Sequence, residues 1–143
     1  ASEAQLMAAK ASFDAKDYTT AKKHLQWVVD KGPAVHSGVA RIRLASVLLE
    51  EKQFDEALKV LDQAKDDAFV SMASDLRGDV LSAQGRRDEA RAAYQIAVEK
   101  ASDRSPMKAL SQAKLDSAGG TTAKPVDKKD DSKDKKDTKE AAK

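Results

Sequence analysis

The sequence contains no cysteine and few prolines, glycines or aromatic residues, and these shortages exclude several classes of protein. Without cysteine the chain has no disulfide framework, no thiolate zinc site, no iron–sulfur cluster and no cysteine nucleophile. Its uninterrupted apolar runs reach three or four residues, whereas a membrane-spanning helix needs roughly 20. We therefore expect no membrane span and no signal peptide in this chain.

The net charge of +2 is concentrated at the C-terminal end. Residues 119–143 hold eight lysines and six acids, whereas residues 1–118 hold 18 basic and 18 acidic residues. The only apolar residue larger than alanine in the C-terminal segment is Val126, so this segment cannot bury enough apolar area to offset its backbone entropy. We predict a folded domain at 1–118 and a disordered charged tail at 119–143. Because the acids of the tail cancel the field of its lysines, we expect a solvated spacer rather than an interaction tail, and no nucleic-acid partner.

The folded part is predicted to be all-α, because helix-forming residues dominate it and no alternating run of β-branched residues occurs. Ser2 followed by Gln5 resembles a capping box. Pro33 is suited to the first position of a helix, and Ser105 before Pro106 has the same cap-then-proline signature. Breakers at regular distances divide the chain into short helices joined by short connections, which implies antiparallel hairpins. The predicted helices are 2–16, 18–30, 33–52, 54–65, 69–84, 88–101 and 106–117.

Three stretches of the chain resemble one another, at residues 9–28, 45–64 and 78–97. Each begins with a small residue, has a tight turn seven residues later and an alanine five residues after that. The spacing between units is 36 and 33 residues. We interpret the small residues as sites where the two helices of a hairpin approach closely, and the larger residues that follow as filling the gap to the next hairpin. The corresponding positions are Ala9, Ala45 and Gly78; Lys16, Lys52 and Gly85; Ala21, Ala57 and Ala90; Leu25, Leu61 and Tyr94; and Val28, Ala64 and Ala97.

A unit of about 34 residues with these features is typical of tetratricopeptide repeats, and residues 1–101 resemble that superfamily. The predicted fold is therefore a tetratricopeptide-like solenoid of three helical hairpins with a C-terminal capping helix. Residues 74–100, with Gly78, Gly85 and Tyr94, further resemble the YfgM-like family of ancillary SecYEG translocon subunits. The resemblance extends to residues 43–45, 57–62 and the helix after Pro106, and covers about 115 residues in all.

The resemblance implies a location and partners. Members of this family have a short cytoplasmic N-terminus, one transmembrane helix and a periplasmic repeat domain. This chain would be the periplasmic part, at the periplasmic face of the bacterial inner membrane, without the single-pass anchor. The resemblance implies partnership with the SecYEG translocon and with a membrane-anchored periplasmic chaperone of the prolyl-isomerase type.

No combination of residues in the sequence indicates catalysis, a metal site or a cofactor. His24 and His36 lack the spacing of a helical metal pair, and the glycines form no phosphate loop. Adjacent carboxylates such as those of Glu50 and Glu51 point about 100° apart on a helix and do not share a site. We expect Trp27 to pack within its hairpin rather than form a ligand platform. Arg43 and Arg77 are expected to be solvated or in ion pairs, with partner contact as the alternative.

The sequence therefore predicts a function carried out by a surface, with no enzyme activity. In tetratricopeptide folds the first helices line a concave face that can bind an extended or helical peptide. Equally, the apolar residues on this face could pack against neighbouring hairpins or the last helix. The lysine and asparagine set that grips a terminal carboxylate in some such domains is missing, because Leu6, Ile42 and Asp75 occupy its places. The repeat register assigns to this groove Leu6, Lys10, Phe13, Val39, Ile42, Ser46, Leu49, Met72, Asp75 and Asp79.

Two hypotheses follow for the function. The first is a non-catalytic interaction module that works with the translocon and periplasmic chaperones on exported proteins. The second is a structural scaffold that acts through self-association, as a homodimer, or in cell-envelope assembly, because the apolar end faces of a short repeat stack can pair.

Overall fold

The computed structural model describes residues 1–120, and within them the chain forms seven α-helices, one short 3₁₀ helix and no strand. The helix bounds lie within three residues of those predicted from the sequence, so the all-α prediction is confirmed. The elements are α1 (Ser2–Asp14), α2 (Tyr18–Lys31), α3 (Ala34–Glu50), α4 (Phe54–Asp62), η1 (Asp67–Phe69), α5 (Val70–Ala83), α6 (Arg87–Lys100) and α7 (Pro106–Ser117).

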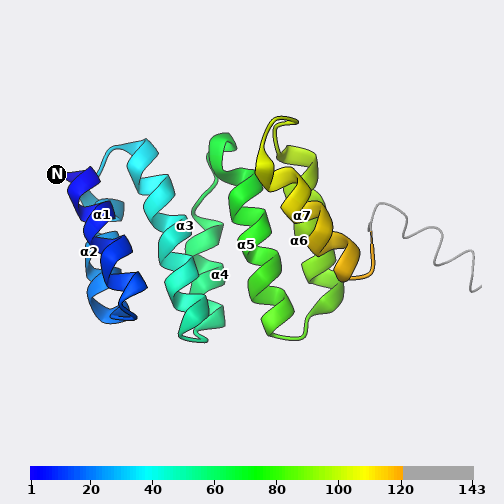
Figure 1. Cartoon of the computed structure of the whole chain (residues 1–143), viewed down its shortest axis with the longest axis horizontal. Coiled ribbons are helices and arrows are strands. Elements are labelled where there is room, and N and C mark those ends of the chain that lie inside the picture. The colour runs from blue at the N-terminus through cyan, green and yellow to red at the C-terminus, as the bar shows by residue number, and fades with distance from the viewer. Residues whose placement is uncertain (121–143) are drawn as a thin grey trace, which may run out of the picture.

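The helices form three antiparallel hairpins, α1–α2, α3–α4 and α5–α6, that stack side by side (Figure 1). The first helices α1, α3 and α5 lie on one side of the stack, and α3 contacts both of the others. Helix α7 packs against α6 at the C-terminal end. This arrangement confirms the predicted solenoid of three hairpins with a capping helix.

The three hairpin turns have the same backbone geometry. Lys16, Lys52 and Gly85 stand at equivalent positions and adopt left-handed φ angles of 62°, 61° and 76°. This conformation brings the next N–H group back onto the end of the preceding helix, which satisfies a carbonyl that the helix leaves unpaired. The bonds are Asp17 N–H to Ser12 O (2.8 Å), Gln53 N–H to Leu48 O (2.8 Å) and Arg86 N–H to Leu81 O (2.9 Å).

The small residues of the repeat lie where the two helices of each hairpin meet. Ala9, Ala45 and Gly78 are buried, as are the alanines of the second helices, Ala21, Ala57 and Ala90. In the third hairpin the approach is close, because a Cβ atom added to Gly78 would lie 2.3 Å from Cε1 of Tyr94. The alanine excess of the sequence thus reflects helix-to-helix packing, as predicted.

An aromatic ring lies at the junction of the second and third hairpins. Phe69 lies in the short 3₁₀ helix before α5 and is 8% exposed. Its ring packs against Gly38 of α3, because a Cβ atom at Gly38 would lie 2.2 Å from Cε2 of Phe69. The ring therefore fills the space that the missing side chain of Gly38 leaves open.

The helix starts differ from the sequence prediction in two places. Ser2 is not a cap but the first residue of α1, and its N-cap, Ala1, makes no side-chain hydrogen bond. Gln5, the other half of the predicted capping box, instead contacts Nδ1 of His24 across the hairpin through its Oε1 at 2.5 Å. Pro33 is the N-cap of α3 rather than its first residue. The prediction for Ser105 is confirmed, because its hydroxyl accepts a hydrogen bond from the backbone N–H of Met107.

Helix α7 buries Ser111 and Leu115 and ends before Gly119, which has a φ of 111°. The predicted tail 119–143 lies, from residue 121 onward, outside the described residues. Within residues 1–120, no helix combines the length and the apolar character needed to cross a membrane.

Candidate functional site

The side of the stack formed by the first helices contains two adjoining hollows between α1 and α3. One has a volume of about 320 Å³, and Lys10 and Phe13 of α1 and Ser46 of α3 line it. The other, of about 260 Å³, is lined by Leu6 and Lys10 of α1. Four of the ten predicted groove residues thus surround one depression.

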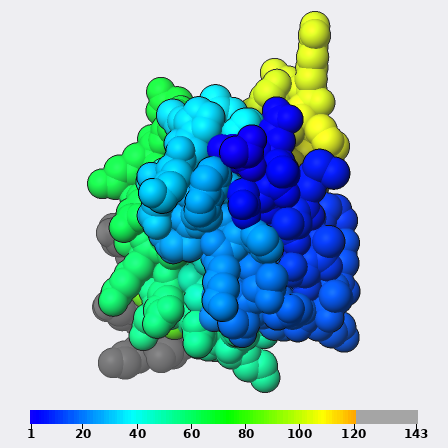
Figure 2. Space-filling model, turned by 90° about the vertical axis from the view of Figure 1, so that its left-hand side faces the viewer, coloured from blue at the N-terminus to red at the C-terminus, as the bar shows by residue number. Residues whose placement is uncertain are grey.

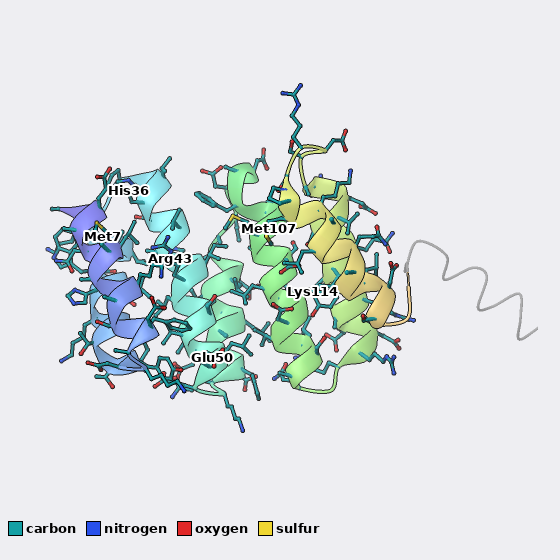
Figure 3. The ribbon with its side chains drawn as sticks, viewed as in Figure 1. Met7, His36, Arg43, Glu50, Met107 and Lys114 are labelled. Atoms are coloured by element: carbon teal, nitrogen blue, oxygen red, sulfur yellow. The ribbon has the colours of Figure 1, made fainter. Side chains whose placement is uncertain are left out.

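Residues outside the predicted set complete these hollows. Ala9, Leu25 and Val47 are buried and line the larger one. Met7, which is 74% exposed, lines the smaller one. Arg43 lines both and lies between α1 and α3, as Figure 3 shows. The depression therefore joins apolar surface to charged side chains of both signs, because Asp14 lines the larger hollow and Glu3 the smaller one.

The predicted groove residues of α3 are only partly at the surface. Ile42 is 7% exposed and belongs to the hydrophobic core, and Val39 and Leu49 are half-buried against that core. Ile42 is therefore a packing residue, as the alternative interpretation of the sequence allowed. The exposed residues of α3 on this side are Arg43 and Glu50.

The groove positions predicted from the repeat register, Ile42 and Leu49, each lie one residue before the exposed Arg43 and Glu50. Neighbouring residues on a helix point about 100° apart, so a one-residue shift replaces an exposed side chain with a buried one. A signal was present in the sequence, because Arg43 and Glu50 are charged residues seven apart, about two helical turns, whereas the other charged residue of α3, Arg41, does not share this spacing. That spacing marks the solvent-facing row of α3.

The acidic end of the predicted groove is covered by α7. Asp75 is 4% exposed, and Ser111 donates a hydrogen bond to its Oδ1 at 2.7 Å. Nζ of Lys114 donates to Oδ2 of Asp75 at 2.8 Å and to Oδ2 of Asp79 at 3.0 Å. The assignment of Asp75 to an open groove was therefore wrong, because α7 folds back over this side of α5. Met72 alone of the three predicted residues on α5 is exposed.

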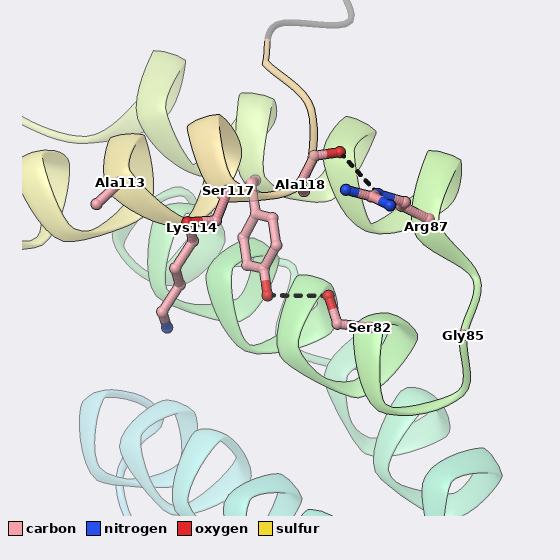
Figure 4. A pocket seen from close by; sticks show the side chains of 8 residues that line it. Ser82, Gly85, Arg87, Ala113, Lys114, Ser117 and Ala118 are labelled. Atoms are coloured by element: carbon pink, nitrogen blue, oxygen red, sulfur yellow. Dashed lines mark hydrogen bonds between the residues drawn. The ribbon is translucent and has the colours of Figure 1, made fainter.

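Tyr94 of α6 completes this polar cluster. Its hydroxyl donates a hydrogen bond to Oδ1 of Asp79 at 2.8 Å and lies 3.3 Å from Oγ of Ser82. Tyr94 lines a hollow of about 510 Å³ between α5, α6 and α7 together with Ser82 and Lys114, and Figure 4 shows Ser82 and Lys114 beside it. Because two carboxylates already neutralise Lys114, this hollow offers no unpaired positive charge from that residue.

The cluster shifts two pKa values in the same direction. Burial raises the pKa of Tyr94 well above its ordinary value, and the carboxylates of Asp79 and Asp75 add to the increase. Burial acts to lower the pKa of Lys114, but the hydrogen bonds to Asp75 and Asp79 outweigh it and the pKa is raised. Both groups therefore hold their protons more tightly in the folded protein than in the unfolded chain.

We expect the folded protein to lose stability in alkaline solution. A group whose pKa is raised by folding contributes its full stabilisation at any pH below its pKa in the unfolded chain, which is about 10 for tyrosine and lysine. This contribution is lost as the pH rises toward the pKa of the group in the folded protein. Above about pH 10 the free energy of unfolding should fall by about 1 kcal/mol per pH unit for each group. Denaturant titrations of the wild type and Tyr94→Phe at a series of pH values measure this. The variant should show the shallower fall, and equal slopes would contradict the assignment.

The other residues considered in the sequence analysis form ion pairs, pack against the core or are exposed. Arg77 forms an ion pair with Asp62, and Trp27 is half-buried against the core, as expected. Glu51 pairs with Lys22 at 2.6 Å, whereas its neighbour Glu50 is exposed. In the part of the chain that the structure describes, no group of three or more histidines or acidic residues could hold a metal ion.

Comparisons with known proteins agree with the repeat architecture. A family model described as "Tetratricopeptide repeat-like domain" matches residues 1–120. A Neisseria gonorrhoeae protein is 39% identical over 118 residues, which are 82% of this chain and 56% of that protein. An Escherichia coli protein is 36% identical over 73 residues, covering 51% of this chain and 35% of that protein. One from Aggregatibacter actinomycetemcomitans is 35% identical over 94 residues, covering 65% and 46%.

All three relatives carry the name "Ancillary SecYEG translocon subunit". The chain spans from about a third to a little over half of the length of these relatives.

Proposed function

Because this chain belongs to the tetratricopeptide repeat-like domain family, we propose that it is a non-catalytic protein-interaction module of an ancillary subunit of the SecYEG translocon. The names of the similar proteins from three bacteria support this proposal. Repeat domains of this kind bind partners through an extended surface rather than a catalytic centre. We expect no enzyme activity from the domain.

The proposal extends to a location and a working partner. The domain would lie at the periplasmic face of the bacterial inner membrane and assist newly exported proteins. Its partner there would be a membrane-anchored chaperone of the prolyl-isomerase type, as the family resemblance implies. The depression between α1 and α3 is the observation that carries the interaction role, because it combines apolar walls with a charged rim.

Partner contact should concentrate in the N-terminal half of the stack. Helix α7 covers Asp75 and limits access to the corresponding side of α5, whereas α1 and α3 leave their side open. Peptide-binding grooves between helices typically accept apolar anchor side chains from an extended or helical segment. The hollows next to Phe13 and Leu6 have the apolar lining for such anchors.

Site-specific photo-crosslinking in cells that make the full-length protein tests this proposal. A photoreactive amino acid at Met7, beside the depression, should crosslink to translocon or chaperone proteins. The same amino acid at Lys23, an exposed residue of α2, should give few such products. Loss of this difference, with the two positions giving the same crosslinked proteins, would contradict the proposed surface.

A pair of arginine substitutions provides the matched control. Ser46→Arg places a long side chain in the larger hollow, whereas Thr19→Arg places one in a separate hollow beside α2. We expect Ser46→Arg to reduce the crosslinks from Met7 by about tenfold, the effect of losing one well-packed anchor. Thr19→Arg should leave them unchanged. Circular dichroism of both variants establishes that they remain folded.

Self-association is the second candidate function, because large apolar residues are exposed near the N-terminal end. Met7 is 74% and Val35 65% exposed. Figure 2 looks onto this end, where atoms of α1 and α2 form much of the surface. Sedimentation of the isolated chain at high concentration tests this candidate, and a strictly monomeric species would exclude it.

A further inference from the structure

Arg43 is a cation without a partner in a surface rich in ion pairs. Lys10, its neighbour in both hollows, is bound by Asp14 at 2.8 Å. Arg43 is exposed and makes no hydrogen bond or ion pair with any other residue in the range 1–120. Glu3 lines the smaller hollow beside it but lies beyond ion-pair distance. The guanidinium group is therefore available to a ligand.

Arg43 and Lys10 line both hollows, and apolar residues line each of them beside the carboxylates of Asp14 and Glu3. Phe13 and Val47 line the larger hollow, and the ring of Phe13 is held by Tyr18, with ring centroids 5.4 Å apart. Leu6 and Met7 line the smaller hollow. Because Arg43 lines both hollows, a ligand that fills them contacts Arg43, together with Lys10.

We propose that this depression binds a segment of a partner protein in which an acidic side chain lies between two apolar ones. The proposal rests on the proposed function and specifies the chemistry of its partner. The apolar side chains enter the two hollows, and the carboxylate accepts hydrogen bonds from the guanidinium of Arg43. Arginine presents paired N–H donors in a planar fork that matches the two oxygens of a carboxylate. Charge complementarity at one central position also fixes the register of the bound segment.

The C-terminal segment of the chain itself does not have this composition. Residues 121–143 contain one apolar residue larger than alanine, Val126, and two hollows need two such anchors. The acids of the segment also stand next to lysines, and the positive charges of these lysines would repel that of Arg43. A foreign segment therefore fits the depression better than the chain's own C-terminal residues.

Fluorescence anisotropy with three labelled peptides tests the proposal on the full chain. The peptides differ only at one position between two leucines, where they carry glutamate, glutamine or lysine, and the distance between the leucines is varied across each set. The glutamate peptide should bind about tenfold more tightly than the glutamine peptide, the effect of one charge-assisted hydrogen-bonded pair. The lysine peptide should bind most weakly.

A charge reversal identifies the responsible residue. Arg43→Glu should reverse the order of affinity, so that the lysine peptide binds better than the glutamate peptide. Arg104→Glu changes the net charge equally at an exposed position between α6 and α7, and the order should stay that of the wild type. Equal affinities for the glutamate and glutamine peptides would overturn the proposal, as would equal effects of the two reversals.

Failure of the acidic-segment inference can be distinguished from failure of the proposed function. Crosslinks from Met7 that Ser46→Arg removes but Arg43→Glu leaves unchanged would overturn the acidic-segment inference and retain the interaction role. Absence of partner crosslinks at Met7 would count against the interaction role itself. A dimer of the wild type that Arg43→Glu dissociates, with no binding of any peptide, would overturn the inference in favour of a second copy as the occupant.

Discussion

Replacing Gly78 with valine is expected to lower the free energy of unfolding by about 3 kcal/mol, at the upper end of the usual cost of overpacking. A Cβ atom at this position would lie 2.3 Å from Cε1 and 2.5 Å from Cδ1 of Tyr94. The ring cannot easily move, because it is buried and its hydroxyl is bound to Asp79. Denaturant titration followed by circular dichroism measures the change. A loss below about 0.5 kcal/mol, within the range of a surface substitution, would contradict the close approach.

A double substitution provides the control for this prediction. The first two units carry alanine and leucine at the positions where the third carries Gly78 and Tyr94. Gly78→Ala combined with Tyr94→Leu reproduces that pairing in the third hairpin. Gly78→Ala and Tyr94→Leu are also measured separately. We expect the double variant to lose less free energy of unfolding than the sum of the two single losses, by about 1 kcal/mol or more, as is usual for residues in contact. Strict additivity would show that the two positions are not packing partners.

Replacing Phe69 with alanine should also destabilise the protein by about 3 kcal/mol, because deletion of a buried ring removes its transfer free energy and leaves a cavity. The ring occupies the space above Gly38 of α3 and connects the second hairpin to the third. Thermal and denaturant unfolding of Phe69→Ala measure the effect.

Phe54 offers a matched comparison, because it is half-buried at the start of α4. Phe54→Ala should cost clearly less than Phe69→Ala, since less of its ring leaves water on folding. Equal losses from the two substitutions would show that Phe69 has no special role in joining the hairpins.

The fold could be predicted from the sequence because its determining contacts are local. Within a hairpin, Ala9 and Ala21 or Ala45 and Ala57 are 12 residues apart, so the repeat pattern places the packing residues directly. The turn residues Lys16, Lys52 and Gly85 mark the same position in each unit, and the structure shows the same backbone conformation at all three. Local packing and local turns fix a stack of this type.

The candidate site was predicted less accurately because it depends on contacts that the repeat pattern does not contain. Asp75 is covered by Ser111, which lies 36 residues further along the chain, and nothing in the repeat register indicates that α7 folds back there. The prediction chose Ile42 over Arg43 because a rotation of one residue about a helix axis changes which side chain is exposed. Such a rotation is set by how α3 fits between α1 and α5, which is a property of the assembled stack.

The contacts between successive helices have a consequence for how quickly the chain reaches its native state. Each helix packs mainly against the one before and the one after it in the sequence. Chains dominated by such local contacts fold in microseconds to milliseconds, because few long loops must close before stabilising contacts form. In a stack of this kind the hairpin α1–α2 can form before α6 and α7 have been synthesised. We therefore expect rapid refolding of the folded stack, which stopped-flow measurement of the refolding rate checks.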